Sequence, residues 1–225
     1  LMRVVMVPPD SVVAECNEVA RGHGRLGAVE AVSVMTYVAP DAAALEDRWL
    51  APDGTPVTIR GIRAGDAALE ARFVRELSAR SRRLRFMDGM RELTPRQVER
   101  FTQPDSRREL ALVALAPPKG TVGDRTDGAG DGHGESIVAV ARYVVDADAQ
   151  GCEFAIVIAD AWQHHGLGRY LLARLIGLAR GAGLTTMRGT VMAENAAMLG
   201  LARRLGFGVT PLPGEYGMRE VTLPL

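Results

Sequence analysis

A glycine-rich loop that opens directly into a helical pattern is the part of this sequence best suited to bind a reactant. The loop and the residue after it are Gln163, His164, His165, Gly166, Leu167, Gly168 and Arg169. Glycines let the backbone approach a ligand closely. The free N–H groups and the dipole at a helix N-terminus attract an anion such as a diphosphate. The dinucleotide fingerprint and the P-loop pattern are both absent. The loop alone therefore predicts either a phosphate-binding site or an ordinary tight turn.

One carboxylate lies in the apolar segment that leads to this loop. Residues 152–158 predict a short buried strand, and Glu153 stands near its start. A carboxylate in such a run is costly to bury unless it is paired or functional, and one held beside an amine can accept its proton. Glu153 is thus either a general base or a strand-end residue that is solvated or paired with an arginine. Cys152 is a weaker candidate, as a nucleophile, because no histidine lies near it in the sequence.

The segments after the loop must hold it in place. A helix with one apolar face is predicted by the spacing of Leu167, Leu171, Leu175 and Leu178. Residues 185–191 predict another strand. Asn195 then stands at the N-cap position of a second helix, and Gly206 and Phe207 close the segment.

The order strand, QxxGxG, helix, strand, Asn, helix, Gly-Phe resembles the pattern of the GNAT acyl-CoA-dependent N-acetyltransferases over roughly residues 55–225. Within that superfamily, EFAIVIADAWQHHGLGRYLLARLIGLAR and AENAAMLGLARRLGF resemble bacterial protein-lysine acetyltransferases that modify acyl-CoA synthetases. The upstream segment SRRLRFMDGMRELTPRQVERFTQPDSRRELALVAL adds to this likeness. The resemblance implies an α/β (α+β) fold. Its mixed, mostly antiparallel sheet is splayed between strands 4 and 5 and flanked by helices.

The resemblance also implies roles for individual residues. Glu153 would be the general base. The residues that would bind acetyl-CoA are Ile156, Val157, Ile158, Gln163, His164, His165, Gly166, Leu167, Gly168, Arg169 and Asn195. Backbone groups of the first three would pair with the pantetheine amides, and the loop would hold the pyrophosphate. Many members carry a tyrosine seven residues after the asparagine, as an acid toward the thiolate. Ala202 occupies that position, so we expect this acid to be missing.

The implied reaction is direct transfer of acetyl from acetyl-CoA to an amine in a ternary complex. A protein lysine, for example of an acyl-CoA synthetase, is the favoured acceptor. Two alternatives stay open: a small-molecule amine as acceptor, and a CoA-binding regulatory module without turnover.

The expected domain covers residues 51–225, and the segments upstream of residue 152 supply the rest of it. The remaining predicted strands cover residues 56–62, 109–116, 137–145 and 218–225. Helices are predicted after Asp66 and at 81–86. Thr94 and Gln97 predict a capping box, with Pro95 at the first helical position.

Two segments give weaker signals. Residues 1–50 predict an N-terminal extension of uncertain structure, and a native start near Met35 is one hypothesis for it. Residues 117–135 are rich in glycine and aspartate and predict a flexible loop. The spacing of its potential ligands fits neither an EF-hand nor a zinc site, so no metal is expected; these ligands are Asp124, Asp127, Asp131 and His133.

Composition narrows the function classes. The 225 residues carry 27 basic and 27 acidic side chains, so no strong attraction to nucleic acid or membranes is implied. Two cysteines give no disulfide framework. No run approaches the ~18 apolar residues that span a bilayer. We therefore expect a cytoplasmic protein.

Overall fold

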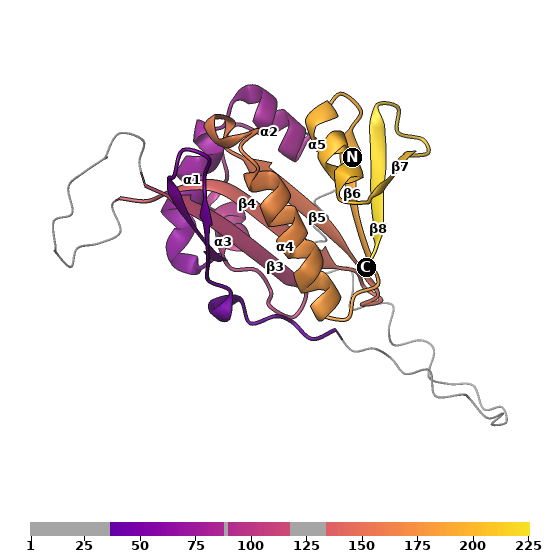
Figure 1. Ribbon diagram of the computed structural model, residues 1–225, viewed down its shortest axis with the longest axis horizontal. Coiled ribbons are helices and arrows are strands. Elements are labelled where there is room, and N and C mark those ends of the chain that lie inside the picture. The colour runs from indigo at the N-terminus through magenta and orange to yellow at the C-terminus, as the bar shows by residue number, and fades with distance from the viewer. Residues whose placement is uncertain (1–36, 88–89, 118–133) are drawn as a thin grey trace, which may run out of the picture.

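The computed structural model describes residues 37–87, 90–117 and 134–225 (Figure 1). Its centre is an eight-stranded sheet in the order β1-β2-β3-β4-β5-β6-β8-β7. The strands are β1 (Asp47–Leu50), β2 (Pro56–Gly61), β3 (Glu109–Ala116), β4 (Ser136–Val145), β5 (Gly151–Ile158), β6 (Thr186–Met192), β7 (Gly208–Pro211) and β8 (Met218–Pro224). Neighbours are antiparallel except β5 and β6, which are parallel. The mixed, mostly antiparallel fold is thereby confirmed.

Helices flank both faces of the sheet (Figure 1). The α-helices are α1 (Ala67–Glu76), α2 (Ala79–Phe86), α3 (Pro95–Thr102), α4 (Leu167–Gly181) and α5 (Ala196–Arg204). Short 3-10 turns lie at η1 (Ala42–Ala44), η2 (Ala64–Asp66) and η3 (Asp160–Trp162). In the described part of the chain, no helix combines the length and the hydropathy that crossing a membrane requires.

The pleat of β5 divides the interior into two cores. Cys152 and Phe154 belong to the core beneath α4 and α5. Val157 points the other way and joins the core beneath α1, α2 and α3. Successive residues of a strand face opposite sides, so β5 is buried on both. The two cores fix this strand from above and below.

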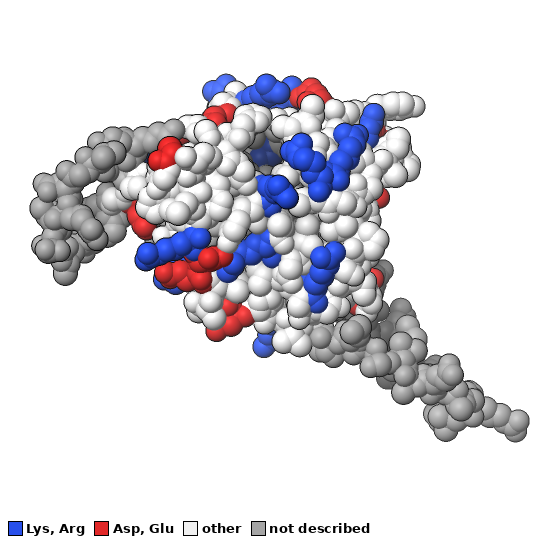
Figure 2. All heavy atoms as spheres, in the orientation of Figure 1, with Lys and Arg blue, Asp and Glu red and all other residues white. Residues whose placement is uncertain are grey.

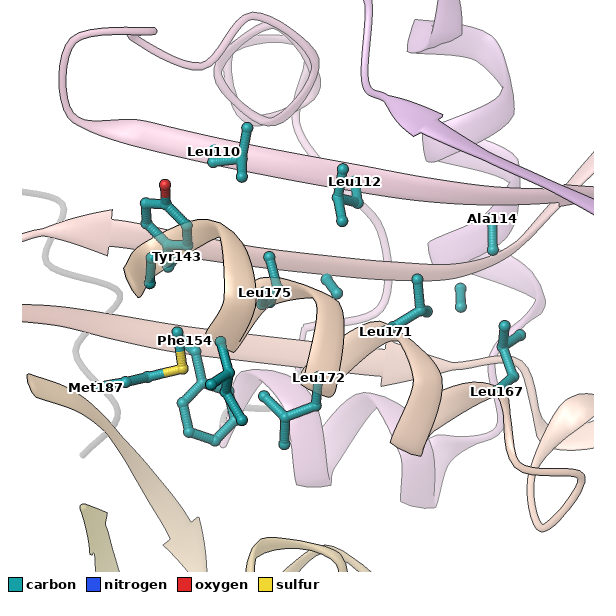
Figure 3. Packing of buried hydrophobic residues seen from close by; sticks show 14 of the residues in the cluster. Leu110, Leu112, Ala114, Tyr143, Phe154, Leu167, Leu171, Leu172, Leu175 and Met187 are labelled. Atoms are coloured by element: carbon teal, nitrogen blue, oxygen red, sulfur yellow. The ribbon is translucent and has the colours of Figure 1, made fainter. Parts of the chain in front are cut away.

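The predicted apolar face of α4 is confirmed (Figure 3). Leu167, Leu171 and Leu175 are fully buried against the sheet, and Leu178 is partly buried against the same core. Figure 3 shows Leu167, Leu171 and Leu175 along α4, with Leu175 near Tyr143. The predicted capping box of α3 is confirmed as well, because Gln97 N–H donates to Thr94 Oγ1 at 3.3 Å and Gln97 Oε1 accepts from Thr94 N–H at 2.8 Å.

The parallel pairing of β5 with β6 is short. It joins Gly151 to Thr186, Cys152 to Met187 and Glu153 to Arg188, and then ends. On its other edge, β5 stays paired with β4 as far as Ile158. The two parallel strands therefore diverge after Glu153. These are the fourth and fifth strands predicted from the sequence. They are labelled β5 and β6 because the structure has an additional first strand, β1, that the sequence pattern did not indicate.

Phe154 fills the base of this divergence. Its ring packs against that of Phe207 with centroids 5.3 Å apart. Across the gap, a Cβ on Gly189 of β6 would lie 2.8 Å from the Phe154 ring. Only a glycine leaves room for the ring at this point, so Gly189 helps to set the angle between the strands.

The sheet begins before residue 51, where the sequence pattern predicts the start of the domain. Strand β1 pairs with β2 from Asp47–Ile59 to Leu50–Pro56. Its four residues, Asp-Arg-Trp-Leu, do not alternate between polar and apolar, and Leu50 is 67% exposed. Tertiary contacts hold the strand, because Asp47 accepts hydrogen bonds from Tyr170 and Arg174 of α4. The hypothesis about Met35 and most of the predicted flexible loop, 118–133, lie outside the described residues.

We predict that Gly189→Ala destabilises the fold by about 1–3 kcal/mol, because the added methyl group forces the Phe154 ring to move. Gly177→Ala is the matched control. Gly177 lies in α4, and its added methyl group would meet open space, with no neighbouring atom within 4 Å. Alanine there should stabilise by about 0.5–1 kcal/mol through helix propensity. Urea denaturation measures both. Equal stability of Gly189→Ala and the wild type would contradict the packing role.

Candidate functional site

A pocket of about 400 Å³ lies where β5 and β6 diverge. Its walls come from residues 154–158 of β5, the loop before α4, the end of β6 and the exposed side of α5. Ser81, Leu84 and Arg85 of α2 complete it. In Figure 2 the surface is hollowed between α2, α4 and α5; basic side chains border the hollow and blue atoms are visible inside it.

The glycine-rich loop forms one end of this pocket. Gly166 is the N-cap of α4 and has φ +95°, a left-handed conformation that favours glycine. His164 has φ 64° and is exposed. Leu167 is fully buried and anchors the first turn to the core. The first N–H groups of α4 therefore stand at a fixed edge of the pocket, where the helix dipole favours an anion.

Hydrogen bonds tie this loop to α2. Gln163 Nε2 donates to the Ile158 carbonyl and to Ser81 Oγ, both at 3.1 Å. Asp160 accepts from Ser78 N–H at 2.9 Å, and from the hydroxyls of Ser78 and Ser81 at 2.7 Å each. Burial alone would raise the pKa of Asp160, but these hydrogen bonds lower it. The carboxylate thus stays ionised and holds the N-terminus of α2 against the loop.

The beginning of α5 forms the opposite wall. Asn195 caps the helix by accepting from Met198 N–H at 3.1 Å, and it also lines the pocket. Arg83 of α2 and Glu194 form an ion pair at 3.3 Å that joins the two walls. Ala202 of α5 is fully buried. Among the described residues that line the pocket, none is a tyrosine.

Glu153 lies at the point where the strands part. It is half-buried, on the same face of β5 as Val157, and its neighbour Phe154 begins the pocket wall. Burial raises the pKa of Glu153; nearby Arg188 opposes this shift and Asp146 adds to it. Arg188 is itself held by Asp146, with Nη2 to Oδ1 at 2.8 Å. No described side chain donates a hydrogen bond to Glu153 or forms an ion pair with it.

Most of the residues selected from the sequence come together in this pocket. They are Ile156, Val157, Ile158, Gln163, His164, Gly166, Gly168, Arg169 and Asn195. His165 instead faces a neighbouring hollow beside Trp49 and Arg174. Leu167 is part of the core, so only its backbone can serve a ligand. Glu153 lies one residue beyond the lining.

The sequence analysis selected no individual residue of α2 or β6. The additional lining residues include Ser81, Leu84, Arg85, Thr190, Val191, Met198, Leu201 and Arg204. The α2 segment ARSRRLRF overlaps a segment that carries the family resemblance, but that resemblance gives none of its arginines a role, and its composition is that of a solvated basic helix. Its four arginines are equivalent in the sequence, so nothing there distinguishes the buried Arg85. Among the described residues, no group of three or more His, Cys, Asp or Glu could hold a metal ion.

Comparisons with known proteins identify the family of this chain. The family model for the acetyltransferase (GNAT) family matches residues 87–207. Acetyltransferase PA5475 of Pseudomonas aeruginosa is 32% identical over 168 residues, which are 74% of this chain and 83% of that protein. The L-methionine sulfoximine/L-methionine sulfone acetyltransferase of Salmonella typhimurium is 39% identical over 67 residues, 30% of this chain and 39% of that protein.

A solved structure has the same fold. The GNAT domain of S. lividans PAT superposes with a TM-score of 0.66 at 24% identity, over 80% of this chain and 97% of that one. With the family match and the Pseudomonas relative, the conclusion is direct: the chain belongs to the GNAT family of acetyltransferases and uses acetyl-CoA as its acetyl donor.

Proposed function

We propose that this acetyltransferase transfers acetyl directly from acetyl-CoA to a primary amine, with Glu153 as the general base. The observation that carries the proposal is the position of Glu153. It is half-buried, without a hydrogen-bond donor among the described side chains, at the point where β5 and β6 diverge. A carboxylate with a raised pKa beside a substrate pocket is suited to accept a proton.

The donor would lie along β5. Its pyrophosphate would bind the N–H groups at Gly166–Gly168, with Arg169 beside them. The backbone groups of residues 154–158 that face β6 have no ladder partner in that strand, so they can pair with the pantetheine amides. The five residue steps from Ile158 to Glu153 span about 16 Å. An extended arm would thus carry the thioester from the loop toward Glu153.

The reaction requires a neutral amine, although a free lysine has a pKa of about 10.4. Glu153 would take the proton as the amine nitrogen attacks the thioester carbonyl. The new C–N bond forms, the C–S bond breaks and the CoA thiolate leaves. Ala202 is buried where related enzymes carry a tyrosine, so water would protonate the thiolate.

A protein lysine side chain is the acceptor that we propose first, with acyl-CoA synthetases as the protein class. The sequence resemblance of the segments around Glu153 and Asn195 supports it. A small-molecule amine is the second candidate, supported by the 67-residue match to a relative named for methionine sulfoximine and methionine sulfone.

The loop assignment predicts a charge effect at Gly166. Asp and Asn have the same size, and both tolerate φ > 0 better than other side chains, so backbone strain should be similar in Gly166→Asp and Gly166→Asn. Only aspartate puts a negative charge beside the pyrophosphate. We expect the aspartate variant to bind CoA at least about tenfold more weakly than the asparagine variant. Calorimetry measures both affinities, and equal values in two folded variants would refute the assignment.

Glu153→Gln should lower the transfer rate by about 10²–10⁴-fold and leave CoA affinity unchanged, because glutamine keeps the shape and loses the base. The activity of the wild type should rise as the pH passes through the raised pKa of Glu153. The pH–rate profile of the variant should lack this rise. When folding raises the pKa of a carboxyl group, the folded protein becomes less stable as the pH rises through that pKa. The variant should therefore be at least as stable as the wild type at neutral pH.

A pH–rate profile paired with a melting curve separates this role from a structural one. A destabilised variant with wild-type turnover per folded molecule would end the general-base proposal. Loss of turnover with intact CoA binding would also argue against a module that only binds CoA.

The acceptor class is tested by mass spectrometry. We expect incubation with acetyl-CoA and a panel of acyl-CoA synthetases to acetylate a lysine, with a rate that falls in Glu153→Gln. Small amines tested at equal concentration should react more slowly. Acetylation of small amines alone would favour the second candidate.

A further inference from the structure

Arg85 is a buried cation in the wall of the pocket. Its side chain lies on α2 and is 7% exposed. The guanidinium stacks over the ring of Phe86, at 5.0 Å from the centroid. Within the described residues it has no hydrogen-bond or ion-pair partner, and its Nη1 is fully buried. An unpaired guanidinium is unfavourable in such a place, so an absent group is expected to complete the site.

The neighbouring charges do not fill this role. Glu70 of α1 is 3% exposed, and its Oε2 also lacks a partner in the described part of the protein. Burial raises the pKa of Glu70, which favours its neutral form. Arg142 of β4 donates from Nη2 to the Phe101 carbonyl at 3.1 Å. Burial and then Arg142 lower the pKa of Arg85 to about 10, so Arg85 stays charged near neutral pH.

The position of Arg85 along the pocket separates it from the phosphate site. Ser81 lies at the loop end, where its hydroxyl accepts from Gln163. Arg85 is one helical turn further along α2, a distance of about 6 Å. There it interacts electrostatically with Glu153. Arg85 is therefore at the end of the pocket where the amine must meet the general base.

We infer that Arg85 binds a carboxylate carried by the acceptor, so that the acceptor is an amine with a carboxylate close to its amino group. This inference rests on the proposed function and refines it. A guanidinium forms two parallel hydrogen bonds with a carboxylate, a geometry that lysine cannot reproduce. The carboxylate has two possible sources: the α-carboxylate of a free amino acid, or an acidic side chain beside the lysine of a protein.

The experiment compares acceptors that differ only in this group. The first pair is a free amino acid and its carboxamide, tested for several amino acids. The other is a lysine peptide with glutamate beside the lysine, and the same peptide with glutamine. We expect the wild type to prefer the carboxylate member of one pair by about 10- to 100-fold in kcat/KM, the range of a charged hydrogen bond. The pair that shows the preference identifies the source.

Arg85→Gln should abolish this preference, because the carboxylate member loses its partner. Arg85→Lys should restore it in part, because the charge remains. Arg80→Gln is the control, since it removes an exposed arginine from the same helix. Calorimetric binding of each acceptor to the CoA-bound wild type and Arg85→Gln proteins gives the same comparison without turnover.

Equal kcat/KM for both members of both pairs in the wild type would overturn the inference and leave the proposed function standing. A preference that persists in Arg85→Gln would also overturn it. Absence of transfer to any amine would count against the proposed function itself. Weaker binding of the carboxylate member to Arg85→Gln would then still support the role of Arg85, and unchanged binding would refute it.

Discussion

The pairing between β5 and β6 ends after Glu153, and the rest of the site depends on that interruption. Strand β5 keeps its antiparallel ladder with β4 to Ile158, whereas its pairing with β6 stops at Glu153. The separation exposes one backbone edge of β5 to a ligand and opens the pocket. Phe154 fills the base of the gap, and Gly189 has no side chain to oppose it. The same geometry leaves Glu153 half-buried at the apex, where burial raises its pKa.

The pocket walls are held by two different kinds of interaction. Helix α4 is fixed by apolar packing, since Leu167 and its neighbours on the same face are buried without polar contacts to direct them. Helix α2 is strongly basic: Phe86 packs into the core at its C-terminal end, and hydrogen bonds position its N-terminus. Asp160 receives three of them from Ser78 and Ser81. These bonds bring α2 alongside β5 and thereby carry Arg85 into the interior.

The two ends of the pocket differ in the charged groups that they present to a ligand. At the loop end, backbone N–H groups and the helix dipole offer partial positive charge that is partly exposed to solvent. Near the other end, Arg85 lines the pocket, and Arg142, Glu70 and Glu153 lie close to it without hydrogen bonds between them. Charges in such a place interact strongly because little water screens them. A bound acceptor would therefore affect the ionisation of Glu153 as well as its own position.

The sequence by itself determined the elements whose signals are local. The leucine spacing of α4, the capping box at Thr94 and the glycine loop each depend on residues within a few positions of one another, and the family pattern orders them. Only the tertiary structure decided which side chains meet across the pocket. Strand β1 does not alternate between polar and apolar residues and is recognised only by its pairing with β2, and Arg85 is indistinguishable from the other arginines of α2 until Asp160, 75 residues later, positions the helix. Such contacts join distant parts of the chain, and no periodicity within either segment encodes them.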